Sequence, residues 1–303
     1  MRIAALDIGG TSIKSGIWTG DLPKEVKEQN TEAKLGGAHV MEQAKRILHS
    51  YGSFDAIGIS TAGQVDSVNG MIRYANENIP GYTGMKIRDI MEKEFSVPVA
   101  VENDVNAAAI GESRFGAGRD MEHFLCITYG TGVGGAVVLN RSIYRGSCFS
   151  AGEFGGILIH PEDRRKGEPF SGCYEKYASA TALVARGKKL DENLDSGRKI
   201  FERIKESKVQ EQVDQWIDEI VCGLISLIHI FNPSGIVLGG GVMAQRYILE
   251  QVQEKVKNQI MPSFCQLKIC QAQLGNQAGL LGAASLAAEA LERQQRSVLE
   301  KDF

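Results

Sequence analysis

The stretch that decides the fold is Ile3-Ala4-Ala5-Leu6-Asp7-Ile8-Gly9-Gly10-Thr11-Ser12-Ile13-Lys14-Ser15-Gly16-Ile17-Trp18. Its first part, Ile3 to Leu6, has the apolar composition of a buried strand, and Ser12 to Trp18 reads as a second strand. The glycines between them allow a tight turn. The chain is therefore predicted to open with a β-hairpin.

The same pattern returns later in the chain. A strand at Leu125–Thr128 leads into the glycine turn Gly130-Thr131-Gly132-Val133-Gly134-Gly135, and a second strand follows at Ala136–Asn140. Two copies of one pattern suggest an internally duplicated fold with pseudo-symmetric lobes. Between the copies, strands alternate with amphipathic helices, which indicates an α/β protein whose sheets are mixed because each contains a hairpin.

Hydrophobic periodicity places the remaining elements. Helices are predicted at Val40–Tyr51, Met85–Phe95, Asp195–Lys208, Val213–Phe231, Arg246–Gln259 and Leu280–Glu300, and strands at Ala56–Ser60, Val97–Val101 and Ile236–Leu238. A chain of 303 residues usually divides its core, so two lobes with a cleft are expected. We expect an N-terminal lobe at 1–115, a C-terminal lobe at 116–279, and a last helix at 280–303 that packs back on the first lobe.

Composition limits the classes of partner. There are 34 Lys and Arg residues against 37 Asp and Glu residues, a formal net charge of −3, which disfavours nucleic acid or an anionic membrane as the main partner. No apolar run is long enough to cross a membrane. Six cysteines without a Cys-x-x-Cys pair are expected to be reduced thiols. The first residues do not form a signal peptide, so a cytoplasmic protein is expected.

The first glycine turn could hold phosphate. The backbone amides of Gly9 and Gly10, the hydroxyl of Thr11 and the ammonium of Lys14 lie at or near the hairpin tip, where successive amides form an anion-binding nest. Asp7 would repel bare phosphate, so it implies a hydrated Mg²⁺ between the two. The alternative is a turn that needs glycine only for its backbone conformation.

The second turn formally contains a dinucleotide-binding Gly-x-Gly-x-x-Gly pattern, but that fingerprint requires a helix directly after the third glycine, and a strand follows here. The first turn is not a Walker A loop, because Ile13 stands where the second glycine is needed. What remains is a pair of phosphate-binding hairpins.

Three further stretches carry polar groups in suitable places. Glu102-Asn103-Asp104-Val105-Asn106 follows a strand and opens a helix, which is the end of an open α/β sheet where ligands bind, although a helix cap alone would explain one of these residues. Glu153 and Glu175 stand in glycine-containing loops, where carboxylates can accept hydrogen bonds from sugar hydroxyls or can simply be solvated. Gly239-Gly240-Gly241 joins a strand to a helix, either as a tight turn or as backbone that lies against a ribose or adenine.

In this order the motifs resemble the ROK family of sugar kinases and sugar-responsive repressors, within the actin, heat-shock protein and hexokinase superfamily. The resemblance spans nearly the whole chain. It also rests on Ser60-Thr61-Ala62-Gly63, Gly152-Glu153-Phe154-Gly155, Gly172-Cys173-Tyr174-Glu175 and Ala278-Gly279-Leu280-Leu281-Gly282-Ala283-Ala284. It implies a two-lobed actin-like ATPase fold, related to ribonuclease H, with a duplicated mixed sheet and an inter-lobe cleft.

The resemblance also implies roles for individual residues. Asp104 would be the catalytic base, and Mg²⁺ would reach Asp7 through ATP. The sugar would be lined by Gly63, Asn76, Asn103, Glu153 and Glu175. ATP would be held by Asp7, Gly9, Gly10, Thr11, Lys14, Gly130, Thr131, Gly132, Gly134, Gly239, Gly240 and Gly241.

One departure from the family pattern concerns zinc. Many members bind a structural zinc through one histidine and three cysteines, whereas here Gly156 replaces the histidine and only Cys173 remains of the cysteines. One ligand does not make a tetrahedral site, so no zinc is predicted, and the pocket should be roomier.

The substrate expected from this branch is a β-glucoside. The stretch Leu227-Ile228-His229-Ile230-Phe231-Asn232-Pro233 looks most like zinc-less β-glucoside kinases, which phosphorylate disaccharides such as cellobiose or aryl β-glucosides. The expected acceptor is the 6-hydroxyl of the sugar. N-acetylmannosamine kinase, glucokinase and fructokinase are the alternatives, and a non-catalytic sugar sensor is disfavoured by the intact Asp104. Because the sequence starts at the first strand, we do not expect the helix-turn-helix that repressor members carry. A homodimer is the family expectation.

Overall fold

The computed structural model describes residues 1–299, and its chain divides into two compact units. The first unit contains 1–119, 142–151 and 276–299, and the second contains 120–141 and 152–275. Each unit is built on a mixed sheet that begins with the predicted hairpin. The hairpins are β1 (Ile3–Ile8) with β2 (Ser12–Trp18), and β8 (Phe124–Tyr129) with β9 (Val133–Leu139), so both predictions are confirmed.

The first sheet has the order β3-β2-β1-β4-β7. Its other strands are β3 (Lys24–Asn30), β4 (Ala56–Thr61) and β7 (Val99–Asn103). β1, β4 and β7 run parallel, and β2 and β3 run antiparallel to their neighbours. The carboxyl ends of β1, β4 and β7 therefore meet at one edge, where Asp7, Ser60 and Asn103 lie.

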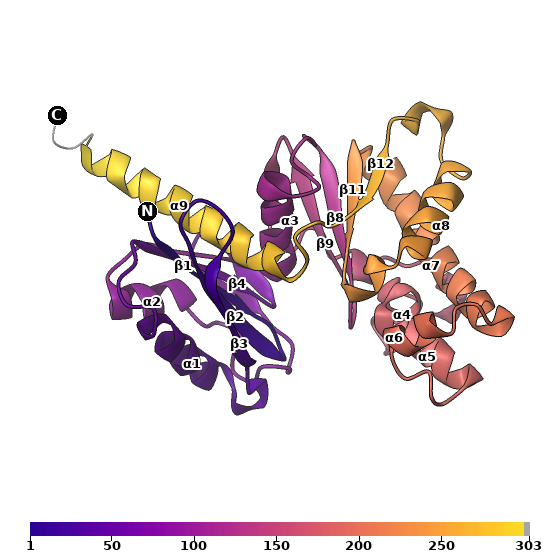
Figure 1. The fold of residues 1–303 in the computed structure, drawn as a ribbon, viewed down its shortest axis with the longest axis horizontal. Helices are drawn as coiled ribbons and strands as arrows, with labels where there is room; N and C mark the ends of the chain where they lie inside the picture. The colour runs from indigo at the N-terminus through magenta and orange to yellow at the C-terminus, as the bar shows by residue number, and fades with distance from the viewer. Residues whose placement is uncertain (300–303) are drawn as a thin grey trace. The chain divides into compact units, whose positions relative to one another are not determined.

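Alternation along β1 fixes the two layers that cover this sheet. Ala4, Leu6 and Ile8 pack into a core with α1 (Gly37–His49) and α2 (Ile87–Phe95), while Ile3 and Ala5 face α9 (Ala278–Leu299). Successive side chains of a strand point to opposite faces, so an almost fully apolar strand requires helices on both faces. Figure 1 shows α1 and α2 on one side of the sheet and α9 on the other.

Glycine allows α9 to approach its neighbours closely. A Cβ at Gly58 in β4 would lie 2.1 Å from the carbonyl oxygen of Ala283, and one at Gly282 would lie 1.8 Å from that of Ala107 in α3 (Asp104–Phe115). Any side chain at either position would push α9 away from the sheet or from α3. The glycines of the terminal motif are thus required by packing.

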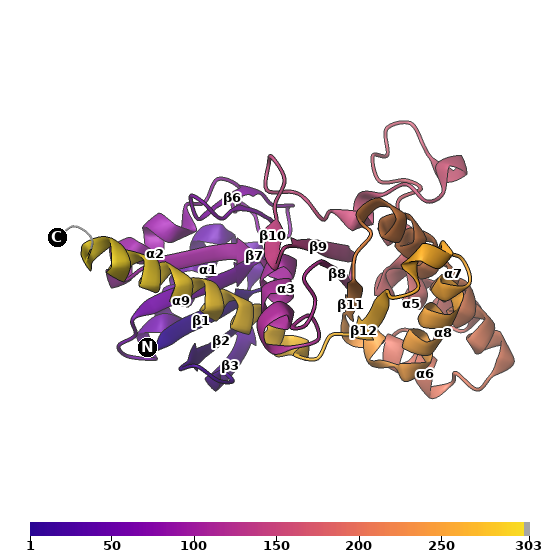
Figure 2. The same ribbon diagram turned by 90° about the horizontal axis from the view of Figure 1, so that it is seen from above.

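The second unit repeats this topology, with strands in the order β9-β8-β11-β12. β8 runs antiparallel to β9, and β11 (Gly235–Gly239) runs parallel to both β8 and β12 (Lys268–Gln271). Figures 1 and 2 show helices α4 to α8 gathered beside this sheet. They are α4 (Glu175–Ala178), α5 (Ala180–Leu190), α6 (Gly197–Glu202), α7 (Ser207–Phe231) and α8 (Arg246–Lys257). The duplicated mixed sheet is confirmed.

Short elements complete the chain. They are β5 (Gln64–Asp66), β6 (Met71–Tyr74), β10 (Ser142–Tyr144) and the 3₁₀ turns at Ala33–Leu35, Phe154–Gly156, Pro161–Asp163, Gly241–Ala244, Pro262–Phe264 and Gly275–Gln277. β10 belongs to the segment grouped with the first unit and lies beside α3 (Figure 2).

One predicted helix is wrong. The structure replaces a helix over Asp195–Lys208 by α6, a turn at 203–206 and the start of α7. Arg203 pairs with Glu206 at 2.7 Å, and the Glu206 carbonyl oxygen accepts from the Val209 and Gln210 amides, which starts the new helix. The predicted end of the last helix, at Glu300, and residues 301–303 lie outside the described residues. No helix within 1–299 is both long and apolar enough to cross a membrane.

Candidate functional site

The first predicted phosphate turn is a tight loop between β1 and β2. The Gly9 amide donates to the Ser12 carbonyl oxygen at 3.0 Å, which closes the turn. Thr31, just after β3, stabilises the turn through two hydrogen bonds. Its hydroxyl donates to the Gly9 carbonyl oxygen at 2.7 Å, and its amide donates to the Thr11 carbonyl oxygen. Gly10 and Thr11 are exposed at the tip. The Gly10 and Thr11 backbone is therefore placed where its amides are candidates to bind an anion.

Asp7 lies directly below this turn, at the carboxyl edge of the first sheet. Its Oδ1 accepts a hydrogen bond from Ser60 Oγ at 2.7 Å, and Lys14 is its neighbour across the hairpin. A Cβ at Gly279 would lie 3.0 Å from the carboxyl, so the first turn of α9 packs against it. Burial raises the pKa of Asp7, against the opposing effects of Ser60 and Lys14.

Asn103 and Asp104 form the junction of β7 and α3. Asn103 caps the helix: its Oδ1 accepts from the Val105 and Asn106 amides at 3.0 and 3.1 Å. Its Nδ2 donates to Asp104 Oδ1 at 2.8 Å and to the Gly63 carbonyl oxygen at 3.0 Å. The amide of Asn103 thus brings Gly63 and Asp104 to one place.

Asp104 has the electrostatics of a proton acceptor near neutral pH. Burial, followed by the negative charge of Asp7, raises its pKa from 3.8 to about 6, while hydrogen bonds from the Val105 amide and Asn103 act in the opposite direction. A base works best when its pKa lies close to the working pH. Half-buried and held by two donors, this carboxylate is suited to accept one proton from a bound hydroxyl group.

Asn76 lies in the exposed loop after β6, where its Oδ1 accepts from the Asn78 amide at 3.1 Å. Its neighbour Ala75 borders Gly63, since a Cβ at Gly63 would lie 3.4 Å from that of Ala75. Gly63 has φ of +101°, which a side chain rarely tolerates. The loop of Asn76 therefore starts beside the Gly63–Asn103 contact.

In the second unit, the turn between β8 and β9 lies against Glu175. The Gly130 amide donates to the Gly132 carbonyl oxygen at 3.0 Å, and the Gly130 carbonyl oxygen accepts from the Ala180 amide at the start of α5. A Cβ at Gly132 would lie 2.7 Å from Glu175 Oε2. Thr131 is exposed at the tip, and Gly134 pairs with Thr128 inside the hairpin.

Glu175 also lies beside the loop of Glu153. A Cβ at Gly155 would lie 3.2 Å from Glu175 Oε2, so the half-buried carboxylate lies between this loop and the β8–β9 turn. Glu153 itself is exposed, and its carbonyl oxygen accepts from the Gly156 amide at 3.1 Å. The structure thus brings the Glu175 carboxylate, the Gly132 backbone and the Glu153 loop together.

The glycine turn after β11 packs on the same hairpin. Gly240 has φ of +104°, and a Cβ there would lie 2.2 Å from the Tyr129 carbonyl oxygen. This contact places Gly239 and Gly241 beside the Gly130 turn. A pocket of about 650 Å³ opens here, lined by Tyr129, Gly130, Ala180, Gly197, Arg198, Phe201, Glu202, Gly241, Val242 and Gln245.

Arg198, Phe201, Glu202 and Gln245 were not predicted as site residues. They lie on α6 and just before α8, and no glycine pattern or unusual spacing marks them in the sequence. Only the tertiary fold, which places α6 and the two glycine turns around one pocket, brings them together.

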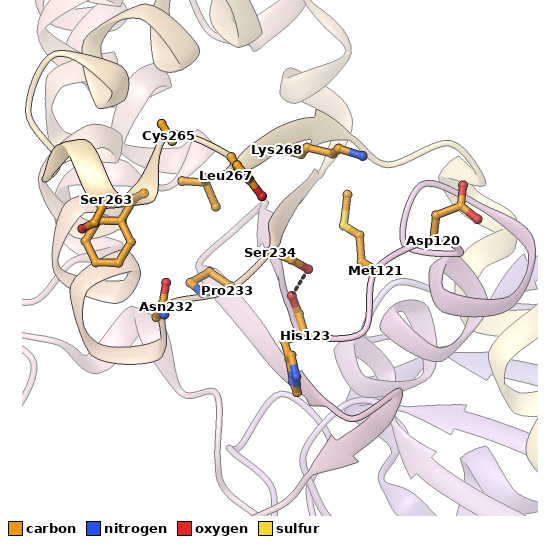
Figure 3. Close-up of a pocket in the computed structure, with 12 residues that line it drawn as sticks. Asp120, Met121, His123, Asn232, Pro233, Ser234, Ser263, Cys265, Leu267 and Lys268 are labelled. Carbon is orange, nitrogen blue, oxygen red and sulfur yellow. Dashed lines mark hydrogen bonds between the residues drawn. The ribbon is translucent and has the colours of Figure 1, made fainter.

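A second pocket of the same unit, of about 480 Å³, lies at the opposite end of its strands. His123, Ser234 and Lys268 line it just before or at the starts of β8, β11 and β12. Figure 3 shows Ser234 turned toward His123, whose carbonyl oxygen accepts from Ser234 Oγ at 2.7 Å. None of the predicted site residues lines this pocket.

Cys173, the remaining family zinc position, donates from Sγ to the Gly156 carbonyl oxygen at 3.2 Å. Within residues 1–299 no three His, Cys, Asp or Glu side chains are grouped so that they could hold a metal ion.

Two sheets of one topology, each with a glycine turn between its first antiparallel strands, define the actin-like ATPase fold. The sequence profile of the ROK family matches residues 3–290, and the chain belongs to that family. A β-glucoside kinase of Listeria monocytogenes is 31% identical, with 93% of this chain and 96% of the relative covered.

Two solved structures are similar over the whole fold. A ROK glucokinase from Streptomyces griseus, in complex with glucose and AMPPNP, has a TM-score of 0.81 and 30% identity, covering 95% of this chain and 100% of the other. A Listeria monocytogenes protein described as a candidate N-acetylmannosamine kinase has a TM-score of 0.86 and 28% identity, covering 97% and 100%.

Proposed function

We propose that this protein is an ATP-dependent sugar kinase that phosphorylates the 6-hydroxyl of a β-glucoside such as cellobiose or an aryl β-glucoside. The observation that carries the proposal is the Asp104 carboxylate, held at a helix N-terminus beside the Asn103 amide and with a pKa of about 6. Membership of the ROK family and the relatives named kinases support it.

In the proposed reaction Asp104 accepts the proton of the sugar hydroxyl. The freed electron pair on the oxygen forms the new bond to the γ-phosphorus as the bond to the β-phosphate oxygen breaks, which leaves ADP. Asn103 holds the Asp104 carboxylate in place, and the Gly63 carbonyl oxygen, fixed by the same amide, is a candidate acceptor for a sugar hydroxyl.

The glycine turn of each unit is a candidate to bind phosphate of ATP, and within the second unit the adenosine would lie in the pocket beside Gly241 and α6. Asp7 fits a magnesium ion bound to the phosphates, because Mg²⁺ in kinases keeps several waters and takes one or two carboxylates from the protein. When bound, Mg²⁺ neutralises charge on the phosphates. Burial disfavours the Asp7 charge, and a cation nearby would favour it.

The β-glucoside assignment rests on the similar β-glucoside kinase and on Gly156. Gly156 is exposed, and a Cβ there would meet only a Phe170 ring carbon, at 3.8 Å, so the loop has space where zinc-binding relatives carry a histidine. Glucose and N-acetylmannosamine are the second candidates, favoured by the two similar solved structures.

The substrate is tested by ADP release from Mg²⁺-ATP over a panel of glucose, N-acetylmannosamine, N-acetylglucosamine, fructose, cellobiose, gentiobiose and salicin. We expect turnover on the β-glucosides, and ³¹P NMR should place the phosphate on the 6-oxygen. Turnover on N-acetylmannosamine or glucose alone would reject the β-glucoside and keep the kinase. ATP binding without turnover on any sugar would favour a sensor.

We also propose that the enzyme is a cytoplasmic homodimer. All six cysteines are free thiols, as in reducing compartments, and the dimer is the family expectation. Light scattering at micromolar concentration measures its mass, and a monomer would contradict the dimer.

A further inference from the structure

Glu102 is a fully buried carboxylate directly before Asn103 and Asp104 in β7. Its Oε1 accepts from the Asn103 amide at 3.0 Å and from Asn106 Nδ2 at 3.1 Å. These are the residues that begin α3. One oxygen of Glu102 therefore fixes the turn within which Asp104 lies.

The other oxygen of Glu102 is held by Arg145. Arg145 donates to Oε2 from Nε at 2.9 Å and from Nη2 at 2.6 Å. The charge of a buried carboxylate must be compensated by a partner with good geometry, and the planar guanidinium provides two donors at once. Neither Glu102 nor Arg145 is among the site residues predicted from the sequence.

Arg145 belongs to a segment with an unusual place in the chain. Residues 142–151 are grouped with the first unit, whereas the residues before and after them belong to the second. The Ala151 amide donates to the Arg145 carbonyl oxygen at 3.1 Å, so residues 145–151 form a closed loop. Glu153 follows Ala151 by two residues, which limits the distance between their Cα atoms to about 7.6 Å.

The segment also holds a strained residue. Phe149 has φ of +59°, a left-handed conformation that bulky residues rarely adopt. Such a conformation persists only where surrounding contacts impose it. The ion pair of Arg145 with Glu102 holds the chain four residues before Phe149, so it is a candidate for that constraint.

We propose that Arg145 is a positioning residue for phosphoryl transfer. Through Glu102 it fixes the turn from Asn103 to Asn106, and with it the Asp104 carboxylate, and it anchors the chain that leads into the Glu153 loop. This role rests on the proposed function of Asp104. Displacement of a reacting group by about 1 Å can lower a rate about 100-fold.

The test compares Arg145→Met, Glu102→Gln and the double variant, with Arg114→Met as the control. Arg114 is a cation on the same helix as Asp104, but it pairs with Glu289 at the surface. Arg145→Met should lower kcat on the accepted sugar 10- to 100-fold and raise the sugar KM, with the ATP KM within about twofold of wild type. Arg114→Met should leave all three constants within about twofold.

The double variant separates positioning from stability. It leaves no unpaired buried charge, so its thermal midpoint should rise above that of Arg145→Met. Its kcat should stay at least about tenfold below wild type, because nothing then ties Arg145's segment to the Asn103 turn. Recovery of kcat together with the midpoint would assign the pair a structural role alone and overturn the proposal.

Amide hydrogen exchange tests the positioning without any turnover. In Arg145→Met, but not in Arg114→Met, the amides of Val105, Asn106 and Ala151 should exchange at least about tenfold faster than in wild type. Unchanged exchange at all three would overturn the proposal. If wild type phosphorylates no sugar, the proposed function fails, and the exchange measurement alone decides whether Arg145 fixes this turn.

Discussion

Replacing Asp104 by asparagine should stabilise the first unit at neutral pH while it removes the proposed base. The pKa of Asp104 rises from 3.8 to about 6 because burial and then the negative charge of Asp7 disfavour the ionised carboxylate. At about 1.4 kcal/mol for each pH unit, keeping this residue ionised lowers the free energy of unfolding by about 3 kcal/mol. Asparagine carries no charge, and its Oδ1 can still accept from Val105 and Asn103.

The gain should depend on pH with a defined sign. Below about pH 3 the carboxyl is mostly protonated in both the folded and unfolded states, so ionisation contributes almost no penalty. Between about pH 4 and 6 the unfolded state loses its proton first, and the stability of wild type relative to Asp104→Asn falls. Above about pH 6 the full penalty is present. The variant should therefore gain up to about 3 kcal/mol at pH 8 and only about 0.5 kcal/mol at pH 4.

Urea unfolding can be followed in the first unit alone. The chain has two tryptophans, so a Trp216→Phe background leaves Trp18, in β2, as the only indole reporter. Asp89→Asn is the matched control, since Asp89 is an exposed acid in the first turn of α2. Loss of its helix-dipole interaction should cost about 0.3 to 1 kcal/mol. Equal stability of wild type and Asp104→Asn at pH 8, or a difference that does not shrink toward pH 4, would refute the reasoning.

Three further predictions concern activity and the core. The kcat/KM for sugar should fall as pH drops through about 6, to about a tenth of its plateau at pH 5, because Asp104 must be ionised; a flat profile from pH 7 to 5 would reject it as the base. Gly132→Ala places a Cβ 2.7 Å from Glu175 Oε2 and should raise the KM for ATP or sugar about tenfold or more, whereas unchanged constants would show that neither ligand uses this turn. Leu224→Ala, at a fully buried position of α7, should lower the free energy of unfolding by about 2 to 5 kcal/mol in urea titrations, and a loss below 1 kcal/mol would mean that the site collapses around the cavity.

Much of the fold follows from local patterns. The hairpin β1–β2 is marked by apolar strands around a glycine turn, and the same pattern marks β8–β9. The stripe of α7 that includes Trp216, Ile220 and Leu224 is buried as its period predicts. Such elements have strong amphipathic or apolar signals that tertiary packing reinforces.

Other elements carried no such signal. β3 is exposed along its whole length, and its sequence is Lys24-Glu25-Val26-Lys27-Glu28-Gln29-Asn30. Its residues show no alternation of apolar and polar side chains that would predict a strand. The strand is defined by its pairing with β2. At the break between α6 and α7, Arg203 pairs with Glu206, a contact of the turn itself. Sequence periodicity does not distinguish this turn from a continuous helix.

The site shows the same division. Asp7, Asn103 and Asp104 lie at the carboxyl ends of strands, where open α/β sheets bind ligands. Their sequence motifs were therefore enough to predict them as site residues. Glu102 and Arg145 are 43 positions apart in the chain, and nothing in either local stretch indicates that they pair. Their contact appears only once the 142–151 segment is placed beside α3.

The central claim is that Asp104 takes the proton of a sugar hydroxyl during phosphoryl transfer. Rapid-quench single-turnover kinetics with γ-labelled ATP tests it, run beside isothermal titration of the sugar into wild type and Asp104→Asn. The account predicts that the variant binds sugar within a few-fold of wild type and transfers the phosphoryl group about 10² to 10⁴ times more slowly. Transfer by Asp104→Asn at a rate close to that of wild type would contradict it.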